Sequence, residues 1–172
     1  MDSILDDAID LESIVQGAPE GAKPELRLWL RMLSTSNLIA QEIRRRLRAE
    51  FGTTLPQFDL MAQLDREKQG LRLGELSRRM MVTNGNVTGL VDRLEAEGLL
   101  VREAADGDRR VTIAKLTKRG EKTFAAMAKA HEGWLRDMLG DVDHRAIEAL
   151  MSNIGAVKGS VLAHLTEGSP SD

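Results

Sequence analysis

Hydrophobic side chains recur at steps of three and four residues along most of this chain, which is the spacing of one face of an α-helix. No glycine or proline interrupts the pattern between Pro24 and Glu50, so the sequence predicts one long helix there, and Gly52 is placed to end it. The same spacing predicts further helices over Pro56–Arg66, Gly74–Met80, Thr83–Glu97, Thr117 to about Leu139, and Asp141 or Asp143 to about Leu165.

Two segments between these helices have the pattern of β-strands, Leu99–Glu103 and Arg110–Leu116. A polar turn, Ala104–Arg109, joins them, and Gly70–Leu73 is predicted to be an extended link. The order helix, short helix, turn, helix and β-hairpin is that of a winged helix–turn–helix. The predicted fold class is therefore mainly α-helical with a small β-wing.

The helices on both sides of this winged module are longer and more apolar than the module needs. They must bury their apolar faces elsewhere, and pairing with a second copy of the chain is the obvious route. We therefore expect an acidic N-terminal extension (1–23), a dimerisation helix (24–52), a winged helix–turn–helix DNA-binding domain (53–117), C-terminal dimerisation helices (118–165) and a flexible tail (166–172).

Composition narrows the class of protein. The 172 residues include no cysteine, which excludes disulfides and thiolate metal sites, and we expect neither a metal nor a cofactor. The first residues are acidic, unlike the start of a signal peptide. No apolar run reaches the roughly 18 residues that a membrane-spanning helix needs. These features predict a cytoplasmic protein without a membrane span.

The formal net charge of −3 is distributed unevenly. Residues 1–23 hold six acids and one base, a balance of −5, so the remainder carries +2. Within 71–119 there are ten bases and seven acids, a balance of +3. Because this excess is small, charge is compatible with DNA binding but does not identify it.

The helix Thr83–Glu97 has the features of a DNA-reading helix. A buried stripe is predicted from the helical spacing of Val87, Leu90, Val91 and Leu94. The opposite face centres on Gly85, Gly89, Asp92 and Ala96. Two glycines inside an exposed helical face cost about 1 kcal/mol each relative to alanine, so a compensating role is expected.

We hypothesise that the two glycines let this helix approach the floor of the DNA major groove closely. Asn86 and Thr88 then reach base edges, and Arg93 reaches a phosphate. The helix N-terminus, with Thr83 and Asn84, offers free N–H groups to another phosphate. The alternative is that both glycines pack beneath a neighbouring helix.

The end of the predicted hairpin carries three charged residues in succession, Asp108, Arg109 and Arg110. One arginine is expected to enter the minor groove, where narrow A·T stretches attract guanidinium groups, and the other to be held by Asp108. Arg109 is favoured for the groove because it lies nearer the tip. Arg102 is a further candidate for phosphate contact, and a solvated charged turn is the alternative.

Taken together, these residues resemble the MarR family of bacterial regulators. The resemblance covers about residues 25–165 and rests on LGELS at 73–77, VTGLVDRLE at 87–95, GLLVR at 98–102, DRR at 108–110 and LTKRG at 116–120. The start of a helix at PQF, 56–58, is also typical. Gly89 stands where many family members carry a basic residue, which departs from the family pattern.

The resemblance implies a triangular homodimer in which the N-terminal helix and the last two helices form the interface. Each subunit presents its recognition helix to one half of a pseudo-palindromic site in double-stranded DNA, about one helical turn from the other half. It also implies repression that is relieved by a small ligand bound between the dimerisation and DNA-binding parts. Such ligands are often aromatic acids, and in some relatives the CoA thioester.

Ligand-binding residues are expected along the long helix if it borders the pocket that the resemblance implies. An aromatic group then stacks near Trp29 or Phe58, and Arg44 or a neighbouring arginine holds a carboxylate or the phosphates of CoA. A hydroxycinnamoyl- or benzoyl-type CoA thioester is the favoured effector. The alternative is a solvated helix face.

Two other functions compete with that of a DNA-binding regulator. An enzyme is not supported, because His131, His144 and His164 lie far apart and neither a phosphate-binding glycine loop nor a nucleophile elbow is present. A winged-helix protein-interaction module without ligand response is the second alternative. It would need neither the paired wing arginines nor a small-residue face on the helix.

Overall fold

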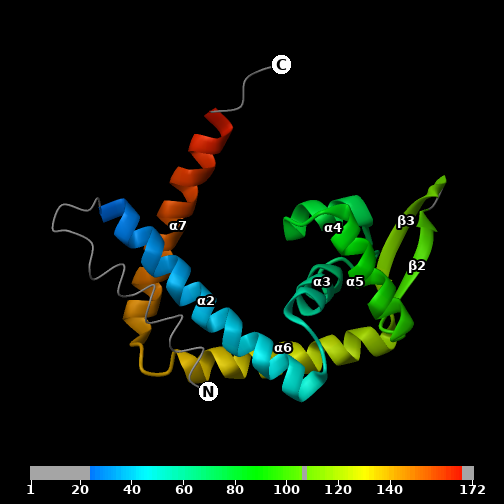
Figure 1. Ribbon diagram of the computed structural model, residues 1–172, viewed down its shortest axis with the longest axis horizontal. Coiled ribbons are helices and arrows are strands. Elements are labelled where there is room, and N and C mark those ends of the chain that lie inside the picture. The colour runs from blue at the N-terminus through cyan, green and yellow to red at the C-terminus, as the bar shows by residue number, and fades with distance from the viewer. Residues whose placement is uncertain (1–23, 106–107, 168–172) are drawn as a thin grey trace. The chain divides into compact units, whose positions relative to one another are not determined.

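The computed structural model describes residues 24–105 and 108–167 and confirms the predicted fold class. The predicted extension 1–23 lies outside the described residues. The chain forms two compact units, with the boundary between Glu132 and Gly133. The elements in chain order are α2 (Pro24–Phe51), α3 (Leu55–Asp65), β1 (Leu71–Arg72), α4 (Leu73–Met80), α5 (Asn84–Ala96), β2 (Leu100–Ala105), β3 (Asp108–Leu116), α6 (Lys118–Met138) and α7 (His144–Glu167) (Figure 1).

Local signals in the sequence explain where α2 ends and α3 begins. Gly52 has a φ of +63°, a left-handed conformation that glycine adopts without steric cost. Thr54 then caps α3: its backbone N–H donates to the Gln57 side chain at 3.0 Å, and its hydroxyl accepts from the Gln57 backbone N–H at 3.4 Å. This reciprocal capping fixes α3 against the end of α2.

The wing is a three-stranded antiparallel sheet in the order β1-β3-β2. The segment expected to be only an extended link contributes β1, with Leu71 opposite Ala114. The turn is also shorter than the predicted Ala104–Arg109, because pairing continues to Ala105 and Asp108 through a register irregularity. Residues 106–107 at the tip lie outside the described residues.

The core of the winged domain lies where α3, α4 and α5 meet the sheet. Its fully buried side chains include Leu60, Met61, Leu64, Leu76, Val87, Val91 and Leu94. The predicted stripe of α5 is therefore right at three of its four positions. Leu90 is only half-buried, because it also borders a surface pocket described below.

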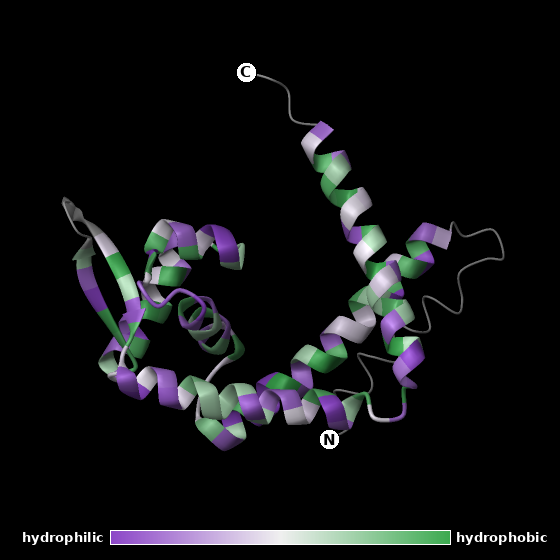
Figure 2. Cartoon of the chain, turned by 180° about the vertical axis from the view of Figure 1, so that it is seen from behind, coloured by the Kyte–Doolittle hydropathy of each residue, from purple (hydrophilic) through white to green (hydrophobic). Residues whose placement is uncertain are grey.

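The last helix is long but has no buried residue. Hydrophobic residues recur along its length in Figure 2, and six of its large apolar side chains are exposed by 47–69 %. Asp143 rather than Asp141 precedes its first turn, and the Asp143 carbonyl accepts from the Ile147 N–H at 3.0 Å. The predicted flexible tail starts too early in the sequence, since the helix continues to Glu167, and 168–172 lie outside the described residues.

None of the helices that the structure describes is long and apolar enough to span a membrane.

Candidate nucleic-acid interface

Helix α5 begins at a capped, exposed N-terminus. Thr83 has extended backbone angles, and its hydroxyl accepts from the Asn86 N–H at 3.4 Å. The Thr88 hydroxyl donates to the Asn84 carbonyl at 3.0 Å. All seven residues predicted on this helix to contact DNA are exposed: Thr83, Asn84, Gly85, Asn86, Thr88, Gly89 and Arg93. The local fold thus presents them together on the surface.

The two glycines of α5 face open space. A Cβ built on Gly85 or on Gly89 meets no heavy atom within 4 Å in the part of the chain that the structure describes. The alternative that they pack beneath a neighbouring helix is therefore wrong for the helices that the structure describes. Gly85 and Gly89 therefore form a strip of exposed helical backbone without side chains.

The turn that precedes α5 is held by the end of α4. Met81 adopts a left-handed conformation with φ 55° and is 93 % exposed. The Ser77 hydroxyl donates to the Val82 carbonyl at 2.5 Å, and the Val82 N–H donates to the Ser77 carbonyl at 3.1 Å. These bonds fix the angle at which α5 leaves α4, which is the geometry that a helix–turn–helix requires.

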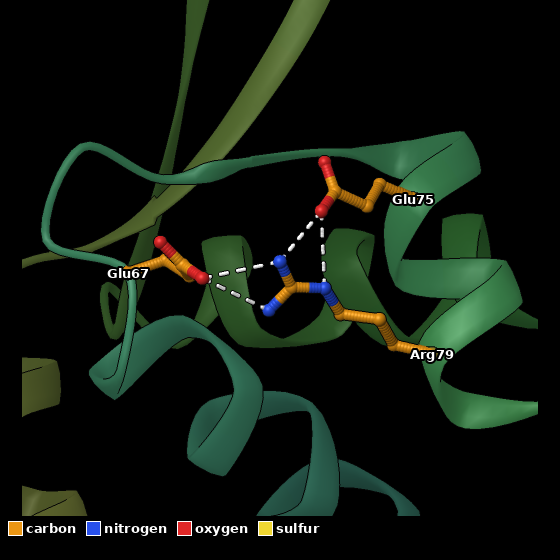
Figure 3. Close-up of polar contacts among 3 residues, drawn as sticks. All are labelled: Glu67, Glu75 and Arg79. Atoms are coloured by element: carbon orange, nitrogen blue, oxygen red, sulfur yellow. Dashed lines mark hydrogen bonds and ion pairs between the residues drawn. The ribbon is translucent and has the colours of Figure 1, made fainter.

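An arginine-centred cluster anchors α4 to the loop before β1 (Figure 3). Arg79 donates to Glu75 through Nη2 at 2.6 Å and to Glu67 through both terminal nitrogens at 3.1 Å. These two carboxylates raise the pKa of the Arg79 guanidinium, Glu75 contributing more. Its charge is thus used within the domain and is not free for a nucleic acid.

Arg102 links the wing to the recognition helix. Its guanidinium pairs with Asp92 of α5 and lies 3.4 Å from a carboxylate oxygen of Glu95. The Arg102 backbone N–H also donates to Glu95 at 3.3 Å. Predicted as a phosphate contact, Arg102 is instead held by two carboxylates, so the contact it makes here positions β2 on α5.

The three charged wing residues lie at the start of β3. Asp108 opens the strand opposite Ala105, and Arg109 and Arg110 follow it. The side chains of 105–111 lie outside the described residues. The roles assigned to Asp108, Arg109 and Arg110 therefore stay predictions.

A pocket of about 630 Å³ opens beside α5, and we call it the arginine pocket. It is formed by the end of α2, the start of α3 and the second half of α5. Its lining residues are Arg44, Arg45, Arg48, Thr54, Leu55, Pro56, Leu90 and Arg93. Four arginines and no acidic residue line it.

The structure separates the three residues predicted to bind a ligand. Arg44 lines the arginine pocket, whereas Trp29 and Phe58 do not. Trp29 is 57 % exposed and lies about 22 Å from Arg44 along the helix axis, at 1.5 Å per residue. Phe58 is buried, with ring centroids 5.5 Å from Phe124 and 5.0 Å from His131. Sequence spacing missed the pocket because its walls come from three elements.

Two carboxyl groups near the pocket have shifted pKa values. Hydrogen bonds from Arg45 and then Arg46 lower the pKa of Glu42 from 4.5 to about 2. Burial raises the pKa of Asp59, with His131 and Arg44 acting in the opposite direction. Arg45 is thus shared between the pocket and Glu42.

Three helices, the last of which is an exposed recognition helix, and a β-wing define a winged-helix DNA-binding protein. Residues 51–111 match the model of the MarR family. The chain is 31 % identical over 125 residues to the transcriptional activatory protein BadR of Rhodopseudomonas palustris, covering 70 % of this chain and 71 % of that relative. It belongs to the MarR family and is a DNA-binding transcriptional regulator, and its relatives are regulators rather than enzymes.

Solved structures agree with this assignment. The structure of a MarR family transcriptional regulator from Silicibacter pomeroyi aligns with a TM-score of 0.69 and 36 % identity, covering 80 % of this chain and 94 % of that one. The MepR–DNA complex of S. aureus aligns with a TM-score of 0.65 over 77 % of this chain and 96 % of that one. The two sequences are only 21 % identical, so this structural similarity shows a shared fold and nothing further.

Proposed function

We propose that this protein is a homodimeric, ligand-responsive repressor. It binds a pseudo-palindromic operator with α5 of each copy in the major groove, and a small aromatic acid or its CoA thioester releases it. The observation that carries the DNA-reading part is the side-chain-free strip of α5, where Gly85 and Gly89 face open space. No packing within the described chain accounts for two helix-destabilising residues at this place.

On this proposal the strip acts by close approach. With no side chain at Gly85 and Gly89, the helix axis moves toward the base edges, and Asn86 and Thr88 on either side come within reach of them. The N–H groups at the helix N-terminus and the Arg93 side chain bind backbone phosphates, which set the register of the helix on the duplex. The wing arginines bind the minor groove.

Exposed apolar side chains support the homodimer. Leu150, Ile154 and Leu165 of α7 are 53 %, 47 % and 62 % exposed, and Trp29 of α2 is 57 % exposed. Soluble monomers rarely leave such extended apolar surface in water. A second copy of the chain, related by two-fold symmetry, covers both helices on this proposal and also supplies the second recognition helix.

The direction of regulation follows from where the operator lies relative to the promoter. BadR is a transcriptional activatory protein, so whether this protein represses or activates transcription needs its own test. A reporter fused to the promoter next to the protein's gene is expected to rise when that gene is deleted. A fall in reporter signal on deletion would make the protein an activator and leave the DNA-binding proposal intact.

The experiment for the DNA-reading strip compares Gly89→Leu with Gly89→Ala. Both residues are better helix formers than glycine by about 1 kcal/mol, so both variants are expected to melt at a higher temperature than the parent. Fluorescence anisotropy on a labelled promoter fragment is expected to show operator affinity falling at least about 100-fold for leucine, comparable to the removal of two or more good base pairings, and much less for alanine.

Stability and operator affinity thus move in opposite directions, which separates loss of DNA binding from loss of fold. The parent is expected to show a steep dependence of affinity on salt concentration, as phosphate contacts require. Operator binding by Gly89→Leu equal to that of the parent would contradict close approach.

A further inference from the structure

The arginine pocket holds more positive charge than its described surroundings neutralise. Arg45 is hydrogen-bonded to Glu42 at 2.7 Å. The side chains of Arg44, Arg48 and Arg93 make no ion pair or hydrogen bond with any side chain that the structure describes. Guanidinium groups gathered at one hollow repel one another unless negative charge lies between them. The pocket is therefore a surface on which acidic groups bind favourably.

The pocket also has an apolar wall, formed by Leu55, Pro56 and Leu90. This wall and the arginines border the same hollow of about 630 Å³. A protein segment that fits such a surface carries acidic and apolar side chains next to each other, because carboxylates then meet the arginines while apolar groups cover the wall. A segment of acidic residues alone leaves the wall in water.

The first 23 residues of this chain, which we call the acidic segment, have that composition. They hold six acids and one base, a balance of −5. Asp6 and Asp10 are four positions apart, and so are Leu5 and Ile9. At 100° per residue, a helix with this spacing has the two pairs at neighbouring positions on one side. Charge and pattern therefore match the acidic segment to the arginine pocket.

The acidic segment is also long enough to reach the pocket. Arg44 lies about 30 Å from Pro24 along the axis of α2, at 1.5 Å per residue. The eleven residues 13–23 span up to about 36 Å when they are extended. Residues 1–12, which carry five of the six acids, are therefore within reach of the pocket of the same chain.

We infer that the acidic segment docks on the arginine pocket and competes there with DNA. Arg93 connects the two events, because it lines the pocket and lies about 40° from Gly89 around α5, at 100° per residue. A carboxylate paired with this guanidinium occupies the group that an operator phosphate would use, and the remaining acids repel the duplex. The inference rests on DNA binding by the chain and is independent of the proposed ligand response.

The exposed apolar side chains of α7 are another surface for the acidic segment. The formal charges of α7 cancel, with histidine neutral, among Arg145, Lys158, Glu148 and Glu167. A segment with a balance of −5 gains no net attraction there, whereas four arginines and no acidic residue line the pocket. Docking on α7 is therefore the weaker candidate and becomes an outcome of the test.

The tether sets the expected strength of competition. A flexible linker of this kind gives an effective concentration on the order of 1 mM. If the segment binds the pocket with a Kd of about 100 µM, the ratio of the two lowers operator affinity about tenfold.

The test neutralises the acidic segment in the full-length protein. Asp2→Asn, Asp6→Asn and Asp10→Asn, combined, are expected to raise operator affinity about five- to tenfold, measured by fluorescence anisotropy at low salt. The matched control removes the same charge from exposed positions after Gly133, by Asp141→Asn, Glu148→Gln and Glu167→Gln. Its effect is expected to be about twofold or less. An equal gain in both combinations, or none in either, overturns the inference.

A double-mutant cycle locates the docking surface. In a protein that also carries Arg44→Gln and Arg48→Gln, the three asparagines are expected to raise operator affinity only about twofold or less, because the segment has already lost its partners. Both arginines are exposed, so the melting temperature of this variant is expected to match that of the parent. An undiminished gain in this background overturns the inference.

A spin label shows directly where the acidic segment lies. The chain has no cysteine, so Ser3→Cys gives a single labelling site. In the DNA-free, full-length protein, paramagnetic broadening is expected at the amide resonances of Leu55 and Leu90, and it should disappear on addition of operator. Broadening confined to α7, or a smaller oligomer in the asparagine variant, would place the segment at the dimer interface. Either result overturns the inference and leaves operator binding intact.

Discussion

Single side chains in this protein act mainly by placing charge. Glu42 is the clearest case, because it holds both Arg45 (2.7 Å) and Arg46 (2.6 Å) on the same face of α2. It thereby keeps both arginines in defined positions, and one of them, Arg45, lines the arginine pocket. These hydrogen bonds require an ionised Glu42 carboxyl, and they lower its pKa to about 2.

Acid is therefore expected to weaken the fold through Glu42. Because its pKa in the folded state is lower than the ordinary 4.5, its contribution is fully present above pH 4.5 and is lost as pH falls toward 2. Glu42→Gln is expected to melt about 1–3 °C lower than the parent at neutral pH, since the pairs are partly exposed.

Thermal melting from pH 7 to pH 2 by circular dichroism checks this. The difference between parent and variant should shrink steadily below pH 4.5 and be reduced further by added salt. A difference that stays constant down to pH 2 would show that Glu42 acts through packing instead.

At the scale of elements, the first turn of α6 is set against the turn between α5 and β2. The Thr117 hydroxyl donates to the Gly98 carbonyl at 2.8 Å and accepts from the Gly120 N–H at 3.0 Å. The Thr117 N–H donates to the Leu99 carbonyl at 3.1 Å. A Cβ built on Gly120 would overlap that same carbonyl oxygen, so only glycine lets the helix lie this close.

Gly120→Ala is consequently expected to destabilise the protein by about 1–3 kcal/mol, the usual cost of overpacking. The matched control is Gly89→Ala, which places the same methyl group in open space and should stabilise by about 0.5–1 kcal/mol. Urea unfolding followed by circular dichroism measures both. If the two alanines changed stability in the same direction, the close contact at Leu99 would not be the cause.

At the scale of the whole molecule, α7 has the composition of an interface, and none of its residues is buried by the part of the chain that the structure describes. Leu150, Ile154, Val161 and Leu165 recur at steps of four and seven residues, which places them on one stripe. Each is about half exposed. Burial of such a stripe against a second copy is the favourable term on which the proposed dimer depends.

Light scattering coupled to gel filtration is expected to show twice the 19.0 kDa of one copy. Ile154→Glu with Val161→Glu should shift the mass toward one copy at micromolar concentration, because each places a charge inside the apolar stripe. Ser152→Glu, about 200° around the helix from Ile154, should keep the mass of the parent. A parent that elutes as a monomer would contradict the homodimer.

Local chemistry explains which features the sequence predicts. Pro24, Gly52 and Thr83 are strong local signals, and α2 and α5 begin or end where they stand. Strand β1 escapes prediction because two residues carry no pattern, and its pairing depends on a strand about 40 positions away. The contacts of Arg102 and the arginine pocket could not be predicted either, because each brings together residues from different elements that are distant in the sequence.

The pairing of β1 with β3 also has a consequence for chain topology. Arg72 opposite Ile113 closes a loop that contains the helix–turn–helix and most of the wing. Closure is tight, because a Cβ built on Gly70 would lie 2.5 Å from the Ala114 carbonyl oxygen. The entropy of closing so long a loop must be recovered by contacts formed inside it. The recognition helix therefore lies within a closed loop, and its stability depends on the pairing of the two-residue strand β1 with β3, which joins the ends of that loop.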